Sequence, residues 1–151
     1  MKIKIYLLFI IFAELTGLLS SLLTDMQGYD QINTSSLTPP AIVFPIVWSL
    51  LFALMGIGIA RIRLAQPSTE RTISSFIYII QLLVNFFWSL IFFNIQAYGL
   101  ALAWIILLWL LIILMIIYYS KVDRTAAVLQ IPYLLWVSFA TYLTYTIWTL
   151  N

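Results

Sequence analysis

The sequence predicts an all-α integral membrane protein, a bundle of five transmembrane helices. Of its 151 residues, 64% are hydrophobic and 8% are charged, a composition far from that of a soluble globular domain. The apolar residues form long uninterrupted runs, and a run surrounded by lipid must satisfy its own backbone hydrogen bonds, as a helix does. We therefore expect a single domain over residues 1–151, placed in the cell membrane as a multi-pass protein.

The first two spans are expected at residues 5–23 and 41–62, each long enough to cross the hydrocarbon core. A short basic stretch before the first run would also fit a signal peptide, but the run is longer than an ordinary signal core and contains Glu14. The polar loop 24–40 separates the two spans. Helices accept proline only in their first turn, so Pro45 should lie in that turn or kink the second helix.

The remaining spans are expected at residues 73–93, 100–119 and 126–150. The connection between the first two of these is so short that they must form an antiparallel hairpin. Pro132 falls in the second turn of the last span and predicts a bend there.

The distribution of charge predicts the orientation. Five spans place the two termini on opposite sides of the membrane, and with these boundaries all seven basic residues fall on the side of the N-terminus. The positive-inside rule then puts the N-terminus in the cytoplasm and loop 24–40 and the C-terminus outside. The basic residues are Lys2, Lys4, Arg61, Arg63, Arg71, Lys121 and Arg124.

The chain contains neither Cys nor His. The commonest metal and haem ligands and the nucleophilic triads are therefore missing, and we expect no metal site and no required cofactor. The formal net charge of +2 is too small to suggest a nucleic-acid partner. A small-molecule ligand would have to be held by shape, stacking and a few hydrogen bonds.

Glu14 is an ionisable residue inside a predicted span. Such a group is costly in lipid and should face protein or water. With Gly17 and Ser21 it forms a small polar face that we expect to point into the bundle. Glu14 could carry a proton or contact a ligand, or it could be a protonated side chain bonded to a neighbouring helix.

Aromatic residues share helix faces in three spans. Trp48 and Phe52 lie one turn apart in the second span, and two further faces combine aromatic with small or polar residues. Such faces suit either ordinary packing or a cavity for a flat apolar ligand. Trp104 and Trp148 are expected at the membrane interface or towards lipid. The two further faces are Asn85, Trp88, Ser89 and Phe92, and Tyr133, Trp136, Ala140 and Thr144.

Small residues in the second span indicate close helix packing. Gly56 and Ala60 form a small-xxx-small pair, which could serve a contact within the bundle or a homodimer.

Four motifs in order resemble the translocator protein or tryptophan-rich sensory protein (TspO/MBR) family over nearly the whole chain. They are Tyr29-Asp30 with Ser36-Leu37-Thr38-Pro39-Pro40; Val43-Phe44-Pro45-Ile46-Val47-Trp48 with Gly56; Asn85-Phe86-Phe87-Trp88-Ser89 with Phe92-Phe93; and Pro132-Tyr133-Leu134-Leu135-Trp136 with Phe139-Ala140-Thr141-Tyr142-Leu143.

The resemblance implies a membrane-embedded binding protein for porphyrins such as protoporphyrin IX and other flat hydrophobic ligands, acting as a sensor or regulator or in porphyrin transport. It implies a pocket closed by the first loop, through Tyr29, Leu37, Pro39 and Pro40. The implied lining residues are Trp48, Phe52, Asn85, Trp88, Phe92, Trp136 and Ala140. In some bacterial members, tryptophans matching Trp48 and Trp136 are implicated in light-dependent porphyrin breakdown, so enzymatic activity is left open.

Departures from the family pattern weaken parts of this expectation. Leu37 stands where the loop usually has Trp, Ser35 where it often has Pro, and Thr144 where an Asn is common. No basic residue follows Tyr142 or Tyr145, so cholesterol recognition there is not supported. An alternative function is a proton-coupled small multidrug-type exporter that uses Glu14, although those transporters have four helices and no long loop.

Overall fold

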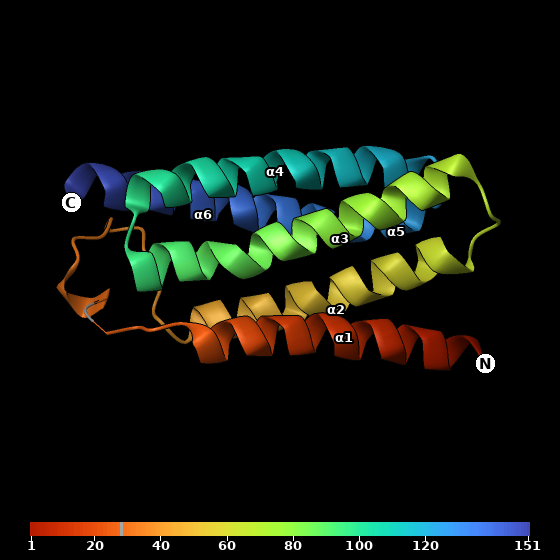
Figure 1. The fold of residues 1–151 in the computed structure, drawn as a ribbon, viewed down its shortest axis with the longest axis horizontal. Helices are drawn as coiled ribbons and strands as arrows, with labels where there is room; N and C mark the ends of the chain where they lie inside the picture. Colours follow the sequence, from red (N-terminus) through yellow and green to blue (C-terminus); the bar gives the residue numbers. More distant parts are fainter. Residues whose placement is uncertain (28) are drawn as a thin grey trace.

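The protein is a bundle of five long apolar spans. The computed structural model describes residues 1–27 and 29–151, and within them it is helical throughout the spans and contains no strand. Figure 1 shows the spans side by side along one long axis. The helices are α1 (Lys2–Leu23), η1 (Tyr29–Gln31), α2 (Val43–Leu64), α3 (Thr69–Ser89), η2 (Leu90–Ile95), α4 (Tyr98–Ser120), α5 (Arg124–Leu129) and α6 (Ile131–Leu150).

Two of the spans consist of two helical segments. The third span continues from α3 into the π-helix η2 and ends at Gln96, whose φ of 57° turns the chain towards α4. The fifth span breaks at Gln130, between α5 and α6, and Pro132 lies at the start of α6. The bend expected from Pro132 is therefore confirmed, and it lies just before the proline because the ring prevents a regular hydrogen bond in the preceding turn.

The helices that begin at the basic connections have side-chain caps. Ser68 Oγ accepts a hydrogen bond from Arg71 N (3.1 Å) at the start of α3, and Asp123 Oδ1 accepts one from Ala126 N (3.0 Å) at the start of α5. Such caps satisfy backbone donors that have no partner within a helix. Pro45 lies in the first turn of α2, the first of its two expected positions, and α2 begins two residues later than the sequence predicted.

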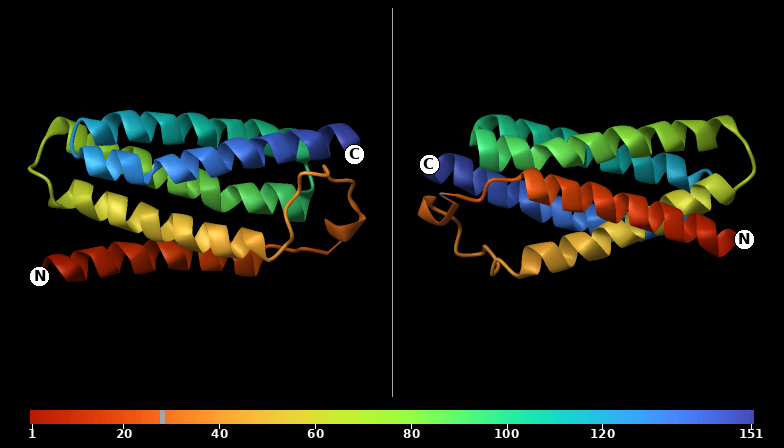
Figure 2. Two further views of the ribbon diagram at one scale, coloured as in Figure 1. Left: turned by 180° about the vertical axis from the view of Figure 1, so that it is seen from behind. Right: turned by 60° about the horizontal axis from the view of Figure 1, so that its bottom comes forward.

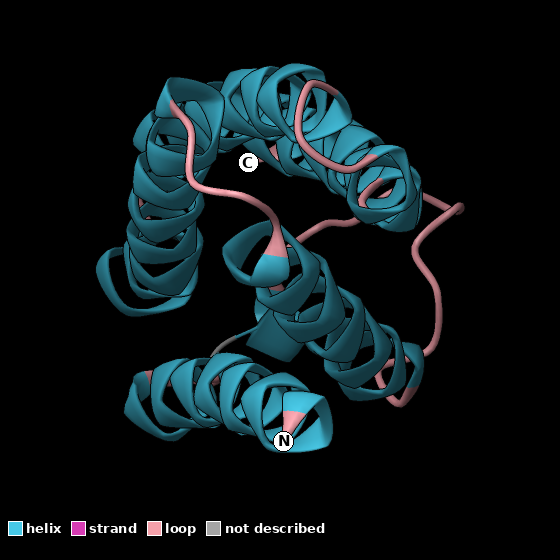
Figure 3. Cartoon of the chain, turned by 90° about the vertical axis from the view of Figure 1, so that its right-hand side faces the viewer, coloured by secondary structure: helices cyan, strands magenta, loops and turns pink. Residues whose placement is uncertain are grey.

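The spans close into a ring-like bundle. α1 packs on α2, α2 on α5, α4 on α3, α5 and α6, and α3 completes the contacts by touching α1 and α2. Figure 2 shows this arrangement from two further sides, and Figure 3 shows it along the bundle axis. α1 lies at the outside of the bundle, and of its residues only Ala13 and Ser20 are buried. The spans from α2 to α6 therefore supply most of the buried side chains.

Close approach of α1 to α2 depends on a glycine. A Cβ built on Gly56 would lie 2.5 Å from the Cα of Ile10, so only glycine fits against the α1 backbone at this point. The expected small-xxx-small contact thus lies within the bundle.

The two termini lie at opposite ends of the bundle, as an odd number of spans requires (Figure 1). The boundaries of the helices put the seven basic residues at the end that holds the N-terminus, as predicted. Which end faces the cytoplasm remains a prediction from the positive-inside rule.

Candidate functional site

Aromatic side chains from α2 and α6 meet inside the bundle. The Trp48 ring lies 5.7 Å from the Phe52 ring and 6.2 Å from the Tyr133 ring, which it meets edge-on at 73°. Near the start of α2, Phe44 meets Trp136 at 5.8 Å, again edge-on. These distances are typical of favourable aromatic pairs. The structure therefore brings together the predicted lining residues Trp48 and Phe52, and it places Trp136 against Phe44, one turn before Trp48 on α2.

A chain of hydrogen bonds runs beside these rings. Asn85 Nδ2 donates to Tyr133 Oη (2.7 Å), and Tyr133 Oη donates to Gln81 Oε1 (2.7 Å). Tyr133 and Gln81 are completely buried. Sequence reasoning found Asn85 and Tyr133 but missed Gln81, although Gln81 lies one turn before Asn85 on the same face of α3. The site thus combines flat apolar rings with one chain of polar groups.

The third aromatic group lies where α3 continues into η2. Trp88 stacks on Phe92 at 5.2 Å with an angle of 27°, and Phe92 is buried. The indole N–H groups of Trp88 and Trp136 are buried and have no hydrogen-bond partner within the described residues. Both indoles therefore have donor capacity that the surrounding chain does not use. Ala140, also buried, lies one turn after Trp136 on α6.

Ser89 belongs to a different contact from the one expected. Its Oγ lies 2.7 Å from Ser20 Oγ and accepts a hydrogen bond from Thr24 Oγ1, so it faces α1 and not the aromatic side chains. Of the three residues predicted on the inward face of α1, Glu14 and Gly17 contact α2, but Ser21 is exposed and Ser20 is buried instead.

Glu14 is bonded to a neighbouring helix. Ser49 Oγ on α2 lies 3.4 Å from each Glu14 carboxyl oxygen. This contact agrees with the interpretation of Glu14 as a side chain bonded to a neighbouring helix. Gly17 on the same face lies against the ring of Phe52. The five-span bundle does not fit the four-helix exporter considered as an alternative.

Trp104 is partly buried. Its indole N–H donates to Val84 O (2.7 Å), which ties α4 to α3 beside the core. Trp148 is half exposed, as expected.

Of the four loop residues predicted to close the pocket, Tyr29 contacts an aromatic side chain of η2. The ring of Tyr29 lies 5.4 Å from that of Phe93, beside the Trp88–Phe92 pair. Pro39 is half-buried, whereas Leu37 is 62% exposed and Pro40 is exposed. Burial and the nearby Asp30 and Tyr98 raise the pKa of Tyr29, so its hydroxyl stays neutral at physiological pH.

A pair of asparagines holds the loop to the end of α6. Asn33 N donates to Asn151 Oδ1 (3.1 Å), and Asn151 Nδ2 donates to Asn33 O (2.9 Å). The loop is thus fixed at Asn33 on the side of α6 and at Tyr29 on the side of η2.

Aromatic side chains of α2 and α6 contact one another between these helices. Two hollows of about 330 Å³ each lie elsewhere, one beside Glu14 on the outer face of α1 and one beside Trp109 and Ser138 between α4 and α6. Within the described residues, no group of three or more acidic side chains is placed to hold a metal ion.

Comparison with known proteins decides the family. The TspO/MBR family model matches residues 9–149, which is nearly the whole chain. The chain belongs to the TspO/MBR family. The resemblance inferred from the sequence is thus confirmed.

Its relatives include bacterial and mammalian members of the TspO/MBR family. The tryptophan-rich protein TspO of Chlorobaculum tepidum is 38% identical over 124 residues, which cover 82% of this chain and 78% of that protein. The tryptophan-rich sensory protein of Cereibacter sphaeroides is 34% identical, over 87% of this chain and 81% of that protein. The translocator protein of Bos taurus is 29% identical, over 95% of this chain and 88% of that protein.

Membership of the TspO/MBR family agrees with the fold. The chain is a multi-pass protein of the cell membrane, associated with the lipid bilayer, and the family supports a sensor or binding role with a small hydrophobic ligand.

Proposed function

We propose that this protein binds porphyrins, such as protoporphyrin IX, and other flat hydrophobic molecules between α2, α3 and α6, and that this binding serves as a sensor or regulator in the membrane. The observation that carries the proposal is the Asn85–Tyr133 hydrogen bond between α3 and α6, with the Trp48 ring of α2 edge-on against Tyr133. Trp88 and Trp136 lie three residues after Asn85 and Tyr133 on the same two helices.

The chemistry of the site suits such a ligand. A porphyrin presents a wide flat ring, which gains from stacking on indole and phenyl faces in a water-free site. It also carries nitrogen atoms and carboxylates, which need hydrogen-bond partners. The free N–H groups of Trp88 and Trp136 and the Asn85 amide supply donors on the same inner faces.

Fluorescence quenching tests the proposal. Protoporphyrin IX is titrated into the purified protein in detergent or nanodiscs while tryptophan emission is followed, and saturable quenching is expected. A Trp48→Phe/Trp136→Phe double variant should lose most of the saturable part, because these indoles would lie against the ligand. The matched control is Trp109→Phe/Trp148→Phe, in which two tryptophans outside the site are removed. Equal saturable quenching in both double variants would exclude this site.

Light-dependent breakdown of the bound porphyrin stays a separate prediction. It requires Trp48 or Trp136 to exchange electrons with the excited ring. Product analysis after illumination should then show new tetrapyrrole products with the wild type and none with the Trp48→Phe/Trp136→Phe variant.

A further inference from the structure

The basic end of the bundle carries far more positive than negative charge. All seven Lys and Arg side chains lie there, whereas of the five acidic residues only Glu70 and Asp123 do. Asp123 is bound by Arg61, and this is the one ion pair within the described residues. The other basic side chains at this end therefore keep a charge that no carboxylate of these residues neutralises.

An arginine of α2 is held against the turn of α3 that carries another arginine. Arg63, in the last turn of α2, donates from Nη1 to Ser75 Oγ of α3 (3.2 Å). Ser75 Oγ in turn donates to the carbonyl oxygen of Arg71 (2.9 Å), one turn earlier on α3. One hydroxyl thus fastens the Arg63 guanidinium to the turn that begins at Arg71.

This contact between two helices goes beyond the sorting of charge across a membrane. The positive-inside rule accounts for the end at which basic residues lie, but it does not bring residues of different helices together. Like charges at neighbouring positions repel, so an anion between them stabilises the arrangement. A guanidinium also presents a planar fork of donors that matches the oxygens of a phosphate. Arg63 and Arg71 therefore supply both the charge and the donors for one phosphate group.

The two arginines lie at the ends of membrane spans, next to an apolar face. The span of α2 ends at Leu64, and the span that contains α3 begins at Thr69. One and two turns after Ser75, Ile79 and Leu83 are 53% and 55% exposed on α3. A phospholipid presents its phosphate and then its acyl chains in the same order along the membrane normal.

We propose that Arg63 and Arg71 bind the phosphate of one anionic phospholipid, such as phosphatidylglycerol, with Ser75 positioning Arg63. The acyl chains lie along Ile79 and Leu83. An anionic headgroup is preferred over a zwitterionic one, because the positive charge of this end repels a choline or ethanolamine group.

This lipid site is independent of the proposed porphyrin site. The connection between α2 and α3 lies at the end of the bundle that holds the N-terminus, away from loop 24–40 (Figure 1). Its tests need no porphyrin, so the two proposals can fail separately.

Native mass spectrometry of the full chain in detergent tests the lipid site. Phosphatidylglycerol and phosphatidylcholine are titrated separately, and the dissociation constant of the first bound lipid is measured. Arg63→Gln/Arg71→Gln should weaken phosphatidylglycerol binding at least about tenfold. The matched control, Lys2→Gln/Lys4→Gln, removes the same charge from exposed positions of α1 at the same end and should weaken it less than about threefold. Equal losses in the two double variants, or equal wild-type affinity for the two lipids, would overturn the proposal.

Ser75→Ala separates the geometry of the site from its charge. The variant keeps every arginine but frees Arg63 from α3, so phosphatidylglycerol affinity should fall about threefold or more. The melting temperature without added lipid should stay close to that of the wild type, which separates positioning from a structural role. Wild-type lipid affinity in Ser75→Ala would contradict the assigned geometry. Inorganic phosphate alone should not compete with the lipid, and full competition would show that the arginines bind a free anion instead.

Discussion

At the scale of single residues, the inner faces of the spans are set by close contacts that allow little change. Gly56 lets the α1 backbone approach α2, and Gly17 makes room for the ring of Phe52, which itself lies against Trp48. Helices in lipid gain stability mainly from such close packing and from hydrogen bonds, because lipid tails are as apolar as the side chains. The position of Trp48 thus depends in part on residues of α1 that would never touch a ligand.

Gly56→Ala should destabilise the bundle. The new Cβ would meet backbone atoms of Ile10, which cannot move without moving α1. We expect a cost of about 1–3 kcal/mol, larger than the gain in helix propensity, seen as a lower melting temperature in detergent. In the control Gly99→Ala the Cβ would meet the half-exposed indole of Trp148, which can turn away. Equal melting temperatures for the two variants would contradict the close α1–α2 contact.

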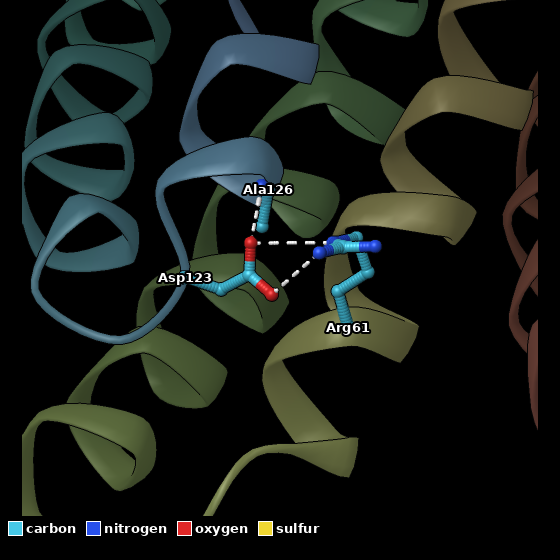
Figure 4. A network of polar contacts seen from close by, with 3 residues as sticks. All are labelled: Arg61, Asp123 and Ala126. Carbon is cyan, nitrogen blue, oxygen red and sulfur yellow. Dashed lines mark hydrogen bonds and ion pairs between the residues drawn. The ribbon is translucent and has the colours of Figure 1, made fainter.

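At the scale of elements, α5 is fastened to α2 by one carboxylate. Asp123 caps α5 through Ala126 N and forms a two-point contact with Arg61 of α2, with Arg61 Nε at 3.2 Å from Oδ1 and an Arg61 terminal nitrogen at 3.0 Å from Oδ2 (Figure 4). Burial disfavours the charged carboxyl, but the hydrogen bonds from Ala126 and Arg61 outweigh it and lower the pKa of Asp123 below 3.8. The contact therefore holds α5 in place at neutral pH.

The Asp123–Arg61 contact should make a small pH-dependent contribution to stability. Because the folded-state pKa of Asp123 is lowered, the contribution is present above about pH 4 and is lost as the pH falls through that pKa. Asp123→Asn keeps a cap but removes the charge, so it should cost less than about 1 kcal/mol near pH 7, since Arg61 is 34% exposed. The difference in melting temperature from the wild type should shrink below pH 4. A difference that persists unchanged to pH 3 would show that the charge of Asp123 does not contribute.

The elements also show what could and could not be predicted from the sequence. The five spans, the bend near Pro132 and the place of Pro45 followed from the thickness of the bilayer and the chemistry of proline. The burial of Ser20 in place of Ser21 did not follow, because Ser20 meets Ser89 on α3, a contact between residues distant in the chain. The hydrogen bond of Trp104 did not follow for the same reason, since its partner is a backbone carbonyl of α3, which has no signature in sequence. The residues around Trp48 were found because helical spacing and the family motifs coincide there.

At the scale of the whole molecule, the bundle is electrically asymmetric. The basic residues lie at one end, and loop 24–40, whose Tyr29 contacts Phe93, lies at the other. If the basic end faces the cytoplasm, a ligand held under this loop is closer to the outer surface of the membrane. Orientation therefore decides from which side the proposed site is reached.

Cysteine labelling in whole cells tests the orientation. The chain has no natural Cys, so a single exposed replacement gives one signal. Ser36→Cys in the first loop should react with a membrane-impermeant maleimide from outside, whereas Gln66→Cys, between α2 and α3, should react only after permeabilisation. The reverse pattern would show that the basic end faces outwards.

The most direct test of the central claim is to fill the proposed site while leaving every tryptophan in place. Ala140→Phe adds a ring on the buried inner face of α6, and Ala103→Phe adds the same ring on an exposed face of α4 as the matched control. Affinity for protoporphyrin IX is measured by absorbance titration of variants first shown to be folded by circular dichroism. We predict at least about a tenfold weaker affinity, roughly 1.4 kcal/mol, for Ala140→Phe and wild-type affinity for Ala103→Phe. Wild-type affinity in folded Ala140→Phe would show that the porphyrin does not bind between α2, α3 and α6.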